Sequence, residues 1–511
     1  MKGFKKVSDD QKVRFIVPAL LVNVFSIVKI PPLGPVLLAS IIFKMFGMDV
    51  EIIDENNYSG PVDKDGLPDH HQLQRDDHAA VVCIYCGMTG TMKRAYELAS
   101  YYYGRGVLTI AGGAHTNMSS EEALDNGFAI VVHGDGEETL VSVFKALMFD
   151  GNLTGIPGIS YIYDGIVKMR NGEKSVWFWN LDEEPLPRFE LFRHLKKPWD
   201  ILPAVLSRGC AKCCSFCSVH CPPRPYSPEY FLRYIQYCTE KYRVKKFFIV
   251  DDWLNGFWQN ATEAFKLITQ EFGDSLRFTV QIELKTADNV EFLEAMYAAG
   301  VRTVCVGMES PVQEDLDAAN KKIEAGSMVS QALVLRKYFW LHAMLIWGLP
   351  NDGPTMLSVG EKIRRFQKLL LETKSCSTQI FPPIPFVGTK MYKDLDAQGR
   401  IFPLDVVPWN RKDGTAACFI PTDMTIRELH ETPTNLMKWF YREASLYSAF
   451  PETPDGSNRF LSRKNWEEFQ TLLLLRIKSE FIIRAWDKQN DKDCGYVERL
   501  EKFVRDNRRA S

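Results

Sequence analysis

The 511-residue sequence lacks several features that would place it in a class at once. Charge of one sign is not in excess, because the formal net charge is only -2. A general nucleic-acid binder usually needs a basic surface, so we expect no nucleic-acid partner, although a local basic patch stays open. A secretory signal is also missing, since no cleavage-site pattern follows the polar start MKGFKKVSDDQKVRF. No internal repeat or low-complexity tract stands out.

An uninterrupted apolar run of membrane-spanning length is missing too. The most apolar stretch, residues 16–48, is broken by Asn23, Lys29 and the segment PPLGP. A helix that crosses a bilayer needs about 20 consecutive, predominantly apolar residues. We therefore expect a buried strand, a loop and a helix in this stretch, no integral membrane span, and a cytoplasmic protein.

The length predicts two or three domains. Over residues 1–164, short apolar runs alternate with helical patterns, which is typical of a parallel sheet covered by helices. Five such runs indicate a flavodoxin-like (Rossmann-like) doubly wound α/β domain, in which ligands bind at the carboxyl ends of the strands. The runs expected as strands are 13–20, 49–54, 79–87, 107–114 and 128–134.

Residues 165–198 are rich in proline and charge and are expected to form a linker. Strand–helix alternation resumes over residues 199–400, where about six units predict a partial (β/α)6 TIM-like barrel, with a full eight-unit barrel as the alternative. Residues 401–511 predict a C-terminal helical region. Its aromatic side chains either close an apolar pocket or pack a helical core; they are Trp409, Trp439, Phe440, Tyr441 and Trp486.

Cysteine, in contrast, is abundant. The chain has 12 cysteines and no visible signal peptide, which favours metal or redox chemistry in a reducing compartment over a disulfide framework. Five of them lie in SRGCAKCCSFCSVHC, residues 207–221. Thiolates that hold an iron–sulfur cluster must converge on a compact core, so close spacing in a loop is expected. The fused pairs Cys210/Cys213 and Cys214/Cys217 leave a tetrahedral zinc site as an alternative, although zinc ribbons normally separate their pairs by a longer loop.

The spacing Cys-x-x-x-Cys-x-x-Cys occurs once, at Cys210, Cys214 and Cys217. Together with the preceding Arg-Gly and with Phe216 before the third cysteine, it resembles the cluster loop of the radical S-adenosylmethionine enzymes. The resemblance implies that these three cysteines ligate a 4Fe-4S cluster whose fourth iron binds S-adenosylmethionine. Cys213 is then left over, as is Cys221; both are interpreted as packing residues of a tight loop, with a role at an auxiliary cluster as the alternative.

Further motifs agree with this resemblance in order and spacing. Polar residues at the ends of barrel strands are typical of active sites, and Glu283 and Glu309 are the best placed for the ribose or amino group of S-adenosylmethionine. For each acid the alternative is a capped turn or a salt bridge. The segment PPIPFVGTKMY departs from the family, because Phe386-Val387 stands where proline directly before glycine is commoner. The residues expected to bind S-adenosylmethionine are Phe216, Asp252, Gln281, Glu283, Glu309 and Ser310.

The N-terminal segments 31–54, 111–124 and 133–140 resemble the cobalamin-binding domain found upstream of the barrel in one large subgroup of that family. Glycines at strand ends would let a flat macrocycle approach the backbone. The usual Asp-x-His-x-x-Gly signature is missing, because DHHQLQ (69–74) lacks the glycine and precedes the third strand. We therefore expect no histidine of this domain to ligate the cobalt. The residues expected at cobalamin are Thr89, Gly90, Gly112, Gly113, His115, Gly134, Gly136 and Glu137.

The resemblance as a whole implies a cobalamin-dependent (class B) radical S-adenosylmethionine enzyme. Such an enzyme cleaves S-adenosylmethionine reductively to a 5′-deoxyadenosyl radical and most often methylates an unactivated carbon through methylcobalamin. Its cofactors would be a 4Fe-4S cluster, S-adenosylmethionine and cobalamin. Its partners would be a small-molecule, lipid or peptide substrate and an external electron donor of the flavodoxin or ferredoxin type. The alternatives are a non-methylating cyclase, a ring-rearranging or lipid-modifying relative, and a non-catalytic cobalamin or iron–sulfur binding protein.

Overall fold

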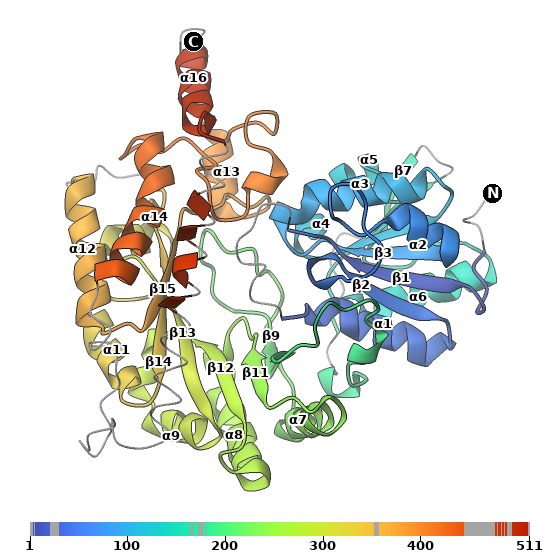
Figure 1. The fold of residues 1–511 in the computed structure, drawn as a ribbon, viewed down its shortest axis with the longest axis horizontal. Helices are drawn as coiled ribbons and strands as arrows, with labels where there is room; N and C mark the ends of the chain where they lie inside the picture. Colours follow the sequence, from blue (N-terminus) through green and yellow to red (C-terminus); the bar gives the residue numbers. More distant parts are fainter. Residues whose placement is uncertain are drawn as a thin grey trace. The chain divides into compact units, whose positions relative to one another are not determined.

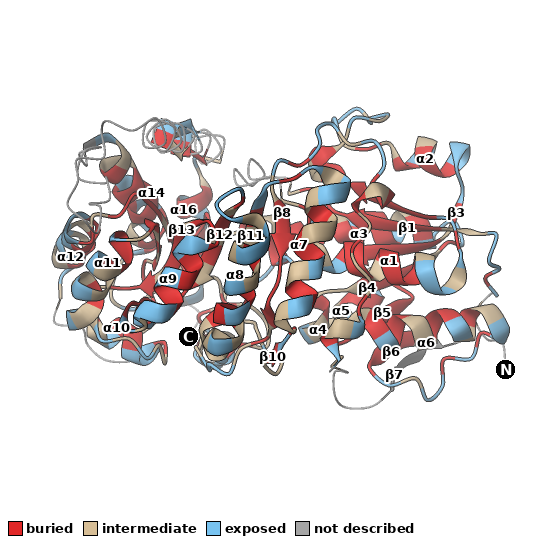
Figure 2. Ribbon diagram, turned by 90° about the horizontal axis from the view of Figure 1, so that it is seen from below, coloured by how far each residue is buried: buried red, intermediate tan, exposed pale blue. Residues whose placement is uncertain are grey.

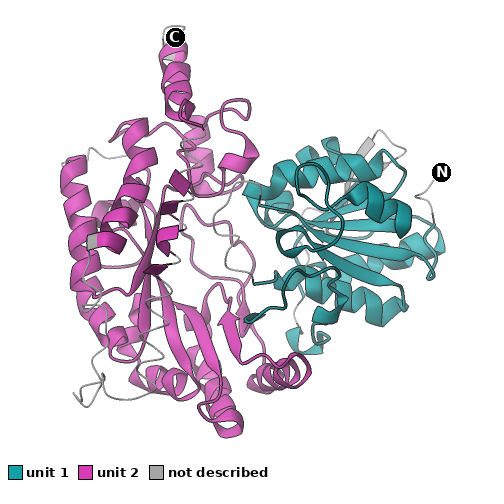
Figure 3. Cartoon of the chain, viewed as in Figure 1, with its two compact units in different colours: residues 1–21, 28–203 teal, residues 22–27, 204–511 magenta. Residues whose placement is uncertain are grey.

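The computed structural model describes most of the chain, and the fold below refers to these residues. They are 4, 6–20, 30–163, 167–171, 177–178, 180–351, 357–443, 476–477, 479–481, 483–484, 486–487 and 493–508. The chain divides into two compact units, residues 1–21 with 28–203 and residues 22–27 with 204–511 (Figure 3). Across the described residues, every helix is too short or too polar to cross a membrane.

The first unit is built on a seven-stranded sheet with the order β2-β1-β3-β4-β5-β6-β7. Its strands are β1 (Lys12–Val17), β2 (Val50–Asp54), β3 (Ala79–Tyr85), β4 (Leu108–Gly112), β5 (Ile130–Val132), β6 (Ile159–Tyr163) and β7 (Val167–Asn171). The first five pair in parallel, and β6 and β7 add an antiparallel hairpin at one edge. The strand order 2-1-3-4-5 is that of flavodoxin-like domains. The doubly wound α/β fold predicted from the sequence is thereby confirmed.

Helices flank this sheet, so its strands are buried on both faces (Figure 2). Strands covered in this way read as continuous apolar runs, as in AAVVCIY of β3. Helix α1 begins after Pro32 and ends at Gly47, which has a left-handed φ of 66° and donates its N–H to Phe43. The helices are α1 (Leu33–Phe46), α2 (His70–Asp76), α3 (Met92–Tyr103), α4 (Ala114–Met118), α5 (Ser120–Asp125) and α6 (Gly136–Phe149).

Much of the stretch expected as a linker is structured against the first unit. Strand β7 lies inside it, and as an edge strand it can be polar, which is why its sequence VKMRN carried no strand signal. Further along, Phe192 forms a parallel bridge with Ile52 of β2, and its ring lies 4.4 Å from that of Trp199. The side chain of Asn57 donates to the carbonyl oxygen of Lys197 at 2.8 Å.

The second unit is built on a six-stranded sheet with the order β15-β14-β13-β12-β11-β8. Its strands are β8 (Leu202–Ala204), β11 (Lys246–Ile249), β12 (Arg277–Ile282), β13 (Val301–Glu309), β14 (Trp340–Ile346) and β15 (Ser377–Phe381). The pairs from β11 to β15 are parallel. Because β8 and β15 remain as its two edges, the sheet is open, as the predicted partial barrel requires.

Helices cover one face of this sheet, and burial alternates along β12 and β14 accordingly. The helices are α7 (Pro228–Tyr242), α8 (Trp258–Phe272), α9 (Val290–Ala298), α10 (Gln313–Ala318), α11 (Met328–Arg336), α12 (Val359–Glu372), α13 (Lys390–Ala397), α14 (Ile426–Glu443) and α16 (Tyr496–Arg508). Helix α14 runs beside the edge strand β15 (Figure 1). There the Tyr441 hydroxyl accepts the Thr378 N–H at 3.0 Å and donates to the Thr378 carbonyl at 2.7 Å, so a helix side chain pairs with the strand's free edge.

Of the five C-terminal aromatic residues, two pack in the core, whereas Trp409, Trp439 and Tyr441 are half-buried. Phe440 and Trp486 are fully buried, and the Trp486 indole donates to the carbonyl oxygen of Thr415 at 3.2 Å. Residues 444–475, which contain part of the helical pattern seen in the sequence, lie outside the described residues.

Candidate cofactor sites

The cysteine loop is closed at its base by two short strands. Strand β9 (Ser207–Arg208) pairs antiparallel with β10 (Arg224–Pro225), and the Cys210 N–H donates to the Cys221 carbonyl at 3.3 Å. Gly209 stands at the turn into the loop with a φ of 82°, and a side chain there would collide with the carbonyl oxygens of Cys221 and Pro222. Glycine is therefore required at this position by both backbone conformation and space.

Two aspartates that follow β11 accept hydrogen bonds from the segment that leads into this loop. Asp251 accepts the Leu206 N–H at 2.8 Å and the Ser207 hydroxyl at 2.6 Å. Burial raises the pKa of Asp251 to about 7, against the opposing effect of these hydrogen bonds. Asp252 accepts the Gly209 N–H at 3.0 Å, and burial likewise raises its pKa. Asp252, predicted to bind S-adenosylmethionine, thus orients the backbone just before the first cysteine.

The three cysteines predicted as cluster ligands are all partly buried. Burial raises the pKa of all three thiols, and the charge of Cys214 raises the pKa of both Cys210 and Cys217 further. Backbone N–H groups point at two of the sulfurs, from Lys212 to Cys210 at 3.3 Å and from Val219 to Cys217 at 3.4 Å. Hydrogen bonds of this kind to sulfur tune iron–sulfur clusters, so the donor set fits a cluster.

The remaining loop cysteines are placed differently. Cys213 is exposed, whereas Cys221 contributes its carbonyl to the base of the loop. Within the described ranges, no three His, Cys, Asp or Glu side chains gather tightly enough to hold a single metal ion. The ligands of a cluster bind different iron atoms and are farther apart, so this finding does not bear on the cluster. The assignment of the three ligands stays a prediction.

The two glutamates predicted to bind S-adenosylmethionine form ion pairs with lysines. Glu309 Oε1 lies 2.7 Å from Lys321 Nζ, and Glu283 Oε1 lies 3.4 Å from Lys212 Nζ. The charges of both lysines lower the pKa of the Cys214 thiol, against the larger effect of burial. Cys214 is therefore within electrostatic range of both Lys–Glu pairs. Neither lysine was expected at the site from the sequence. Lys212 could have been considered because it lies inside the cysteine motif, whereas Lys321 is far from it in the sequence.

The other residues predicted at S-adenosylmethionine have varied surroundings. The Gln281 amide lies 3.8 Å from the Met344 sulfur, and Phe216 is partly exposed in the loop. Ser310, in contrast, is fully buried and donates to Asp315 at 2.9 Å. The structure thus brings Asp252, Glu283 and Glu309 to the cysteine loop through direct contacts or through charge, and it turns Ser310 toward α10.

In the first unit, the carboxyl ends of β3 and β4 are joined backbone to backbone. The Cys86 N–H donates to the Gly112 carbonyl at 2.8 Å, and the His115 N–H donates to the Cys86 carbonyl at 3.1 Å. Gly113 has a φ of 137°, and a Cβ there would lie 2.5 Å from the carbonyl carbon of Cys86. At Gly112, in contrast, an added Cβ meets nothing within 4 Å. Gly113 is needed for close approach, and Gly112 borders open space that would suit a planar ligand.

The remaining residues predicted at cobalamin follow the carboxyl ends of β3, β4 and β5 along the chain. Thr89 Oγ1 lies 3.1 Å from His115 Nδ1, so these two side chains contact each other. Gly90 is buried in the 3-10 turn Thr89–Thr91. Gly134 has a φ of 75° and donates its N–H to the side chain of Asn117 at 3.2 Å. A Cβ at Gly136 would lie 2.8 Å from Leu38, so this glycine allows α6 to pack on α1. Glu137 follows it as a buried residue in the first turn of α6.

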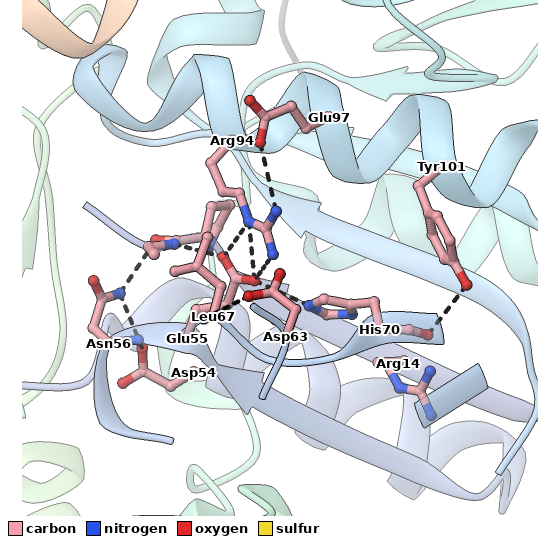
Figure 4. Close-up of polar contacts among 12 residues, drawn as sticks. Arg14, Asp54, Glu55, Asn56, Asp63, Leu67, His70, Arg94, Glu97 and Tyr101 are labelled. Atoms are coloured by element: carbon pink, nitrogen blue, oxygen red, sulfur yellow. Dashed lines mark hydrogen bonds and ion pairs between the residues drawn. The ribbon is translucent and has the colours of Figure 1, made fainter. Parts of the chain in front are cut away.

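His70, the first of the two histidines of the DHHQLQ segment, is part of a buried polar network (Figure 4). His70 Nε2 lies 3.0 Å from Glu55 Oε1, and His70 Nδ1 lies 2.8 Å from the Tyr102 hydroxyl. Arg94 binds the same Glu55 carboxylate at 2.6 Å. Burial lowers the pKa of His70, so the ring is held neutral with both nitrogens engaged. Both ring nitrogens of His70 thus have protein partners, and the expectation that no histidine of this domain ligates cobalt stays a prediction.

Comparisons with known proteins cover both units. Residues 26–144 match the B12 binding domain family. The radical S-adenosylmethionine methyltransferase TsrM from Kitasatospora setae, solved with cobalamin and a 4Fe-4S cluster bound, aligns with 94% of this chain and 99% of its own, with a TM-score of 0.67 at 14% identity. This chain has the fold of the cobalamin-dependent radical S-adenosylmethionine enzymes. OxsB, solved with aqua-cobalamin and S-adenosylmethionine bound, aligns with 98% of this chain and 81% of its own, with a TM-score of 0.63 at 14% identity.

Curated proteins with related sequences include two methyltransferases and a cyclase. An uncharacterised methyltransferase of Pyrococcus horikoshii is 28% identical over 71% of this chain and 78% of its own length. The bacteriochlorophyllide d C-12(1)-methyltransferase of Chlorobaculum tepidum is 20% identical over 87% of this chain and 88% of its own length. The anaerobic magnesium-protoporphyrin IX monomethyl ester cyclase of Cereibacter sphaeroides is 21% identical over 70% of this chain and 58% of its own length.

These comparisons confirm the resemblance and the α/β fold predicted from the sequence. The predicted cofactor set is also the one that the solved structures contain between them, namely cobalamin, a 4Fe-4S cluster and S-adenosylmethionine.

Proposed function

We propose that this protein is a cobalamin-dependent radical S-adenosylmethionine methyltransferase that acts on a carbon atom of its substrate. The observation that carries the proposal is the triad of Cys210, Cys214 and Cys217, partly buried on one loop and electrostatically coupled to one another. The match of residues 26–144 to the B12 binding domain supports the second cofactor.

The chain's own residues would prepare the cluster site. Asp252 orients the backbone before the first cysteine, and backbone N–H groups point at the sulfurs of Cys210 and Cys217. The ammonium groups of Lys212 and Lys321 favour the thiolate form of Cys214, against the larger effect of burial. When bound, the cluster would supply the electron that cleaves S-adenosylmethionine, and cobalamin would carry the methyl group.

Cobalamin would lie at the carboxyl ends of β3 and β4. Gly112 leaves room for a planar ring, while the contacting Thr89 and His115 side chains would border it. The Chlorobaculum relative supports methylation of carbon, since its name specifies a methyltransferase acting at a carbon position. An external electron donor of the flavodoxin or ferredoxin type would complete the reaction.

A second function has support of its own. The Cereibacter relative is named as a cyclase, so a chain of this fold that cleaves S-adenosylmethionine without methyl transfer is the alternative. The two outcomes differ in their products. A methyltransferase yields S-adenosylhomocysteine together with 5′-deoxyadenosine, whereas the cyclase alternative yields 5′-deoxyadenosine alone.

The test is anaerobic reconstitution of the full chain with iron, sulfide and hydroxocobalamin, followed by absorbance spectroscopy and product analysis under strong reduction. We expect a corrin band beside an iron–sulfur shoulder, and both products once a substrate is supplied. A corrin band that is lost on gel filtration would refute the cobalamin part. Intact S-adenosylmethionine in a protein loaded with its cluster would refute the radical part.

A further inference from the structure

A turn outside the cysteine motif holds the middle of the cysteine loop. It consists of Ala319, Asn320 and Lys321, directly after α10. The Ala319 carbonyl accepts the Ser215 N–H at 2.9 Å, and the Asn320 side-chain amide donates to the Cys213 carbonyl at 2.8 Å. These two bonds are made to the residues on either side of Cys214. The predicted ligand is thus fixed by backbone contacts that do not involve its own sulfur.

A second remote segment contacts the same place. The Met391 N–H, in the first turn of α13, donates to the Ser215 carbonyl at 2.9 Å. Both backbone polar groups of Ser215 are therefore paired with residues far along the chain. Inside the loop, the Cys217 N–H donates to the Cys214 carbonyl at 3.2 Å. The conformation at Cys214 depends on partners that the cysteine spacing does not reveal.

The turn is itself well anchored, which makes it suited to hold another segment. Asn320 has a φ of 50°, in the left-handed region where asparagine is better tolerated than most side chains. The Lys321 N–H donates to the Leu316 carbonyl at 2.8 Å, and the Lys321 ammonium pairs with Glu309 at the end of β13. On the other side, Asp315 of α10 pairs with the buried Lys362 at 3.4 Å.

We propose that Asn320 is a positioning residue for the cluster loop, which sets the backbone at Cys214 before the cluster is bound. The identity of the bound group rests on the proposed function, but the positioning is a property of the chain alone. A ligand that is held in place beforehand loses less conformational freedom on binding. Partners that orient metal ligands typically contribute 10- to 100-fold in metal affinity.

Two substitutions remove the bond while keeping the turn. Asn320→Gly retains the left-handed backbone and deletes the donor, whereas Asn320→Asp keeps the shape and places a carboxylate against the Cys213 carbonyl. The matched control is Cys213→Ala, which leaves that carbonyl in place. Hydrogen–deuterium exchange of the metal-free full chain reports on the loop without any cofactor. For both Asn320 variants we expect exchange of residues 213–217 to be about 5- to 10-fold faster, as loss of one hydrogen bond predicts, and no change for Cys213→Ala.

A second measurement tests the consequence for the cluster. We expect iron release from reconstituted Asn320→Gly to a chelator to be about 10-fold faster or more, with an altered electron paramagnetic resonance spectrum of the reduced cluster. Unchanged exchange in residues 213–217 would overturn the proposal, and so would equally faster exchange in α7, which would indicate global destabilisation. If the wild-type chain took up no cluster, the proposed function would fail, whereas the exchange result would still decide whether Asn320 holds the loop.

Discussion

The ammonium of Lys321 lies 2.7 Å from the carboxylate of Glu309 at the carboxyl end of β13. Glu309 has a φ of 61°, a left-handed conformation that is unfavourable for this residue unless its surroundings enforce it. The pairing of β13 with β14 shifts register between Gly307 and Glu309. A Cβ at Gly307 would lie 2.6 Å from Glu309 Oε1, so the acid folds back over its own strand. The position of the Glu309 carboxylate is therefore fixed by the register shift of β13, by the space at Gly307 and by the ion pair with Lys321.

Replacing the cation should expose the energetic importance of this pair. In Lys321→Met, Glu309 would stay 7% exposed without its partner. Breaking a buried ion pair on one side typically costs about 3 kcal/mol or more, so we expect the free energy of unfolding to fall by about that amount. Urea unfolding of the metal-free protein measures it.

The control is Lys266→Met, which breaks a surface pair. The side chains of Lys266 and its partner Glu291 are 47% and 61% exposed. Exposed pairs contribute about 1 kcal/mol or less, so this variant should unfold almost as the wild type does. Equal losses in the two lysine variants would show that the Glu309 pair is no stronger than a surface contact.

Single cysteine substitutions test which loop residues are ligands. Cys210→Ala, Cys214→Ala and Cys217→Ala should each abolish the iron–sulfur absorbance and the cleavage of S-adenosylmethionine, because each removes one of three thiolates. Cys213→Ala should retain both, since Cys213 is exposed. Cys221→Ala should also retain both, because Cys221 supports the loop through its carbonyl. Iron content per chain after reconstitution decides the matter. Iron loss in Cys213→Ala with retention in Cys214→Ala would mean that the triad is chosen wrongly.

Substitutions at two neighbouring glycines should distinguish an effect on cobalamin binding from an effect on folding. Gly113→Ala places a Cβ 2.5 Å from the Cys86 backbone, so we expect a loss of stability on the order of 2 kcal/mol. Gly112→Ala has space on the protein side, so its melting temperature should stay near the wild-type value. If the ring of cobalamin fills that space, Gly112→Ala should still weaken corrin retention on gel filtration. Full corrin retention by a well-folded Gly112→Ala protein would place the cofactor elsewhere.

The architecture was predictable where local sequence carries the structural signal. Central parallel strands such as β3 are continuous apolar runs because both of their faces are covered, and the pattern alone predicts them. The edge strand β7 has one neighbour and a polar sequence, so its place in the sheet follows from the partner β6 and not from its own residues. The same reason explains why residues near Trp199 looked like a linker: their packing partners lie far away in the sequence.

The candidate site likewise combines features with a local sequence pattern and features that depend on residues far apart in the sequence. The cysteine spacing is a pattern over a few residues, so the family resemblance could assign a ligand triad from the sequence, and that assignment stays a prediction. Asn320 and Lys321 act on the loop through a left-handed turn after α10 and through the irregular end of β13, and neither feature has a recognisable local pattern. The two Lys–Glu pairs also required the three-dimensional arrangement, although salt bridges had been the stated alternative for these acids.

A pH titration of stability should report on two histidines of the second unit, the half-buried His342 and the buried His430. Burial lowers the pKa of His342 to about 4, with an opposing hydrogen bond to Gln379, and burial also lowers the pKa of His430 to about 4. Above about pH 6.5 each ring is neutral in both the folded and the unfolded state. Between about pH 6.5 and 4 the unfolded chain binds a proton that the folded chain does not. Stability therefore falls as the pH falls, by up to about 1.4 kcal/mol per pH unit for each histidine.

His342→Asn and His430→Asn should each remove one of these two contributions. The carboxylates titrate equally in all variants, so the difference in slope from the wild type isolates the histidine. Urea unfolding of the metal-free proteins at pH 7, 6 and 5 measures it. We expect the wild type to lose the most stability between pH 6 and 5, each single variant to lose less, and the double variant to lose the least. Parallel curves for all four proteins would mean that both rings bind protons in the folded state as readily as in the unfolded chain.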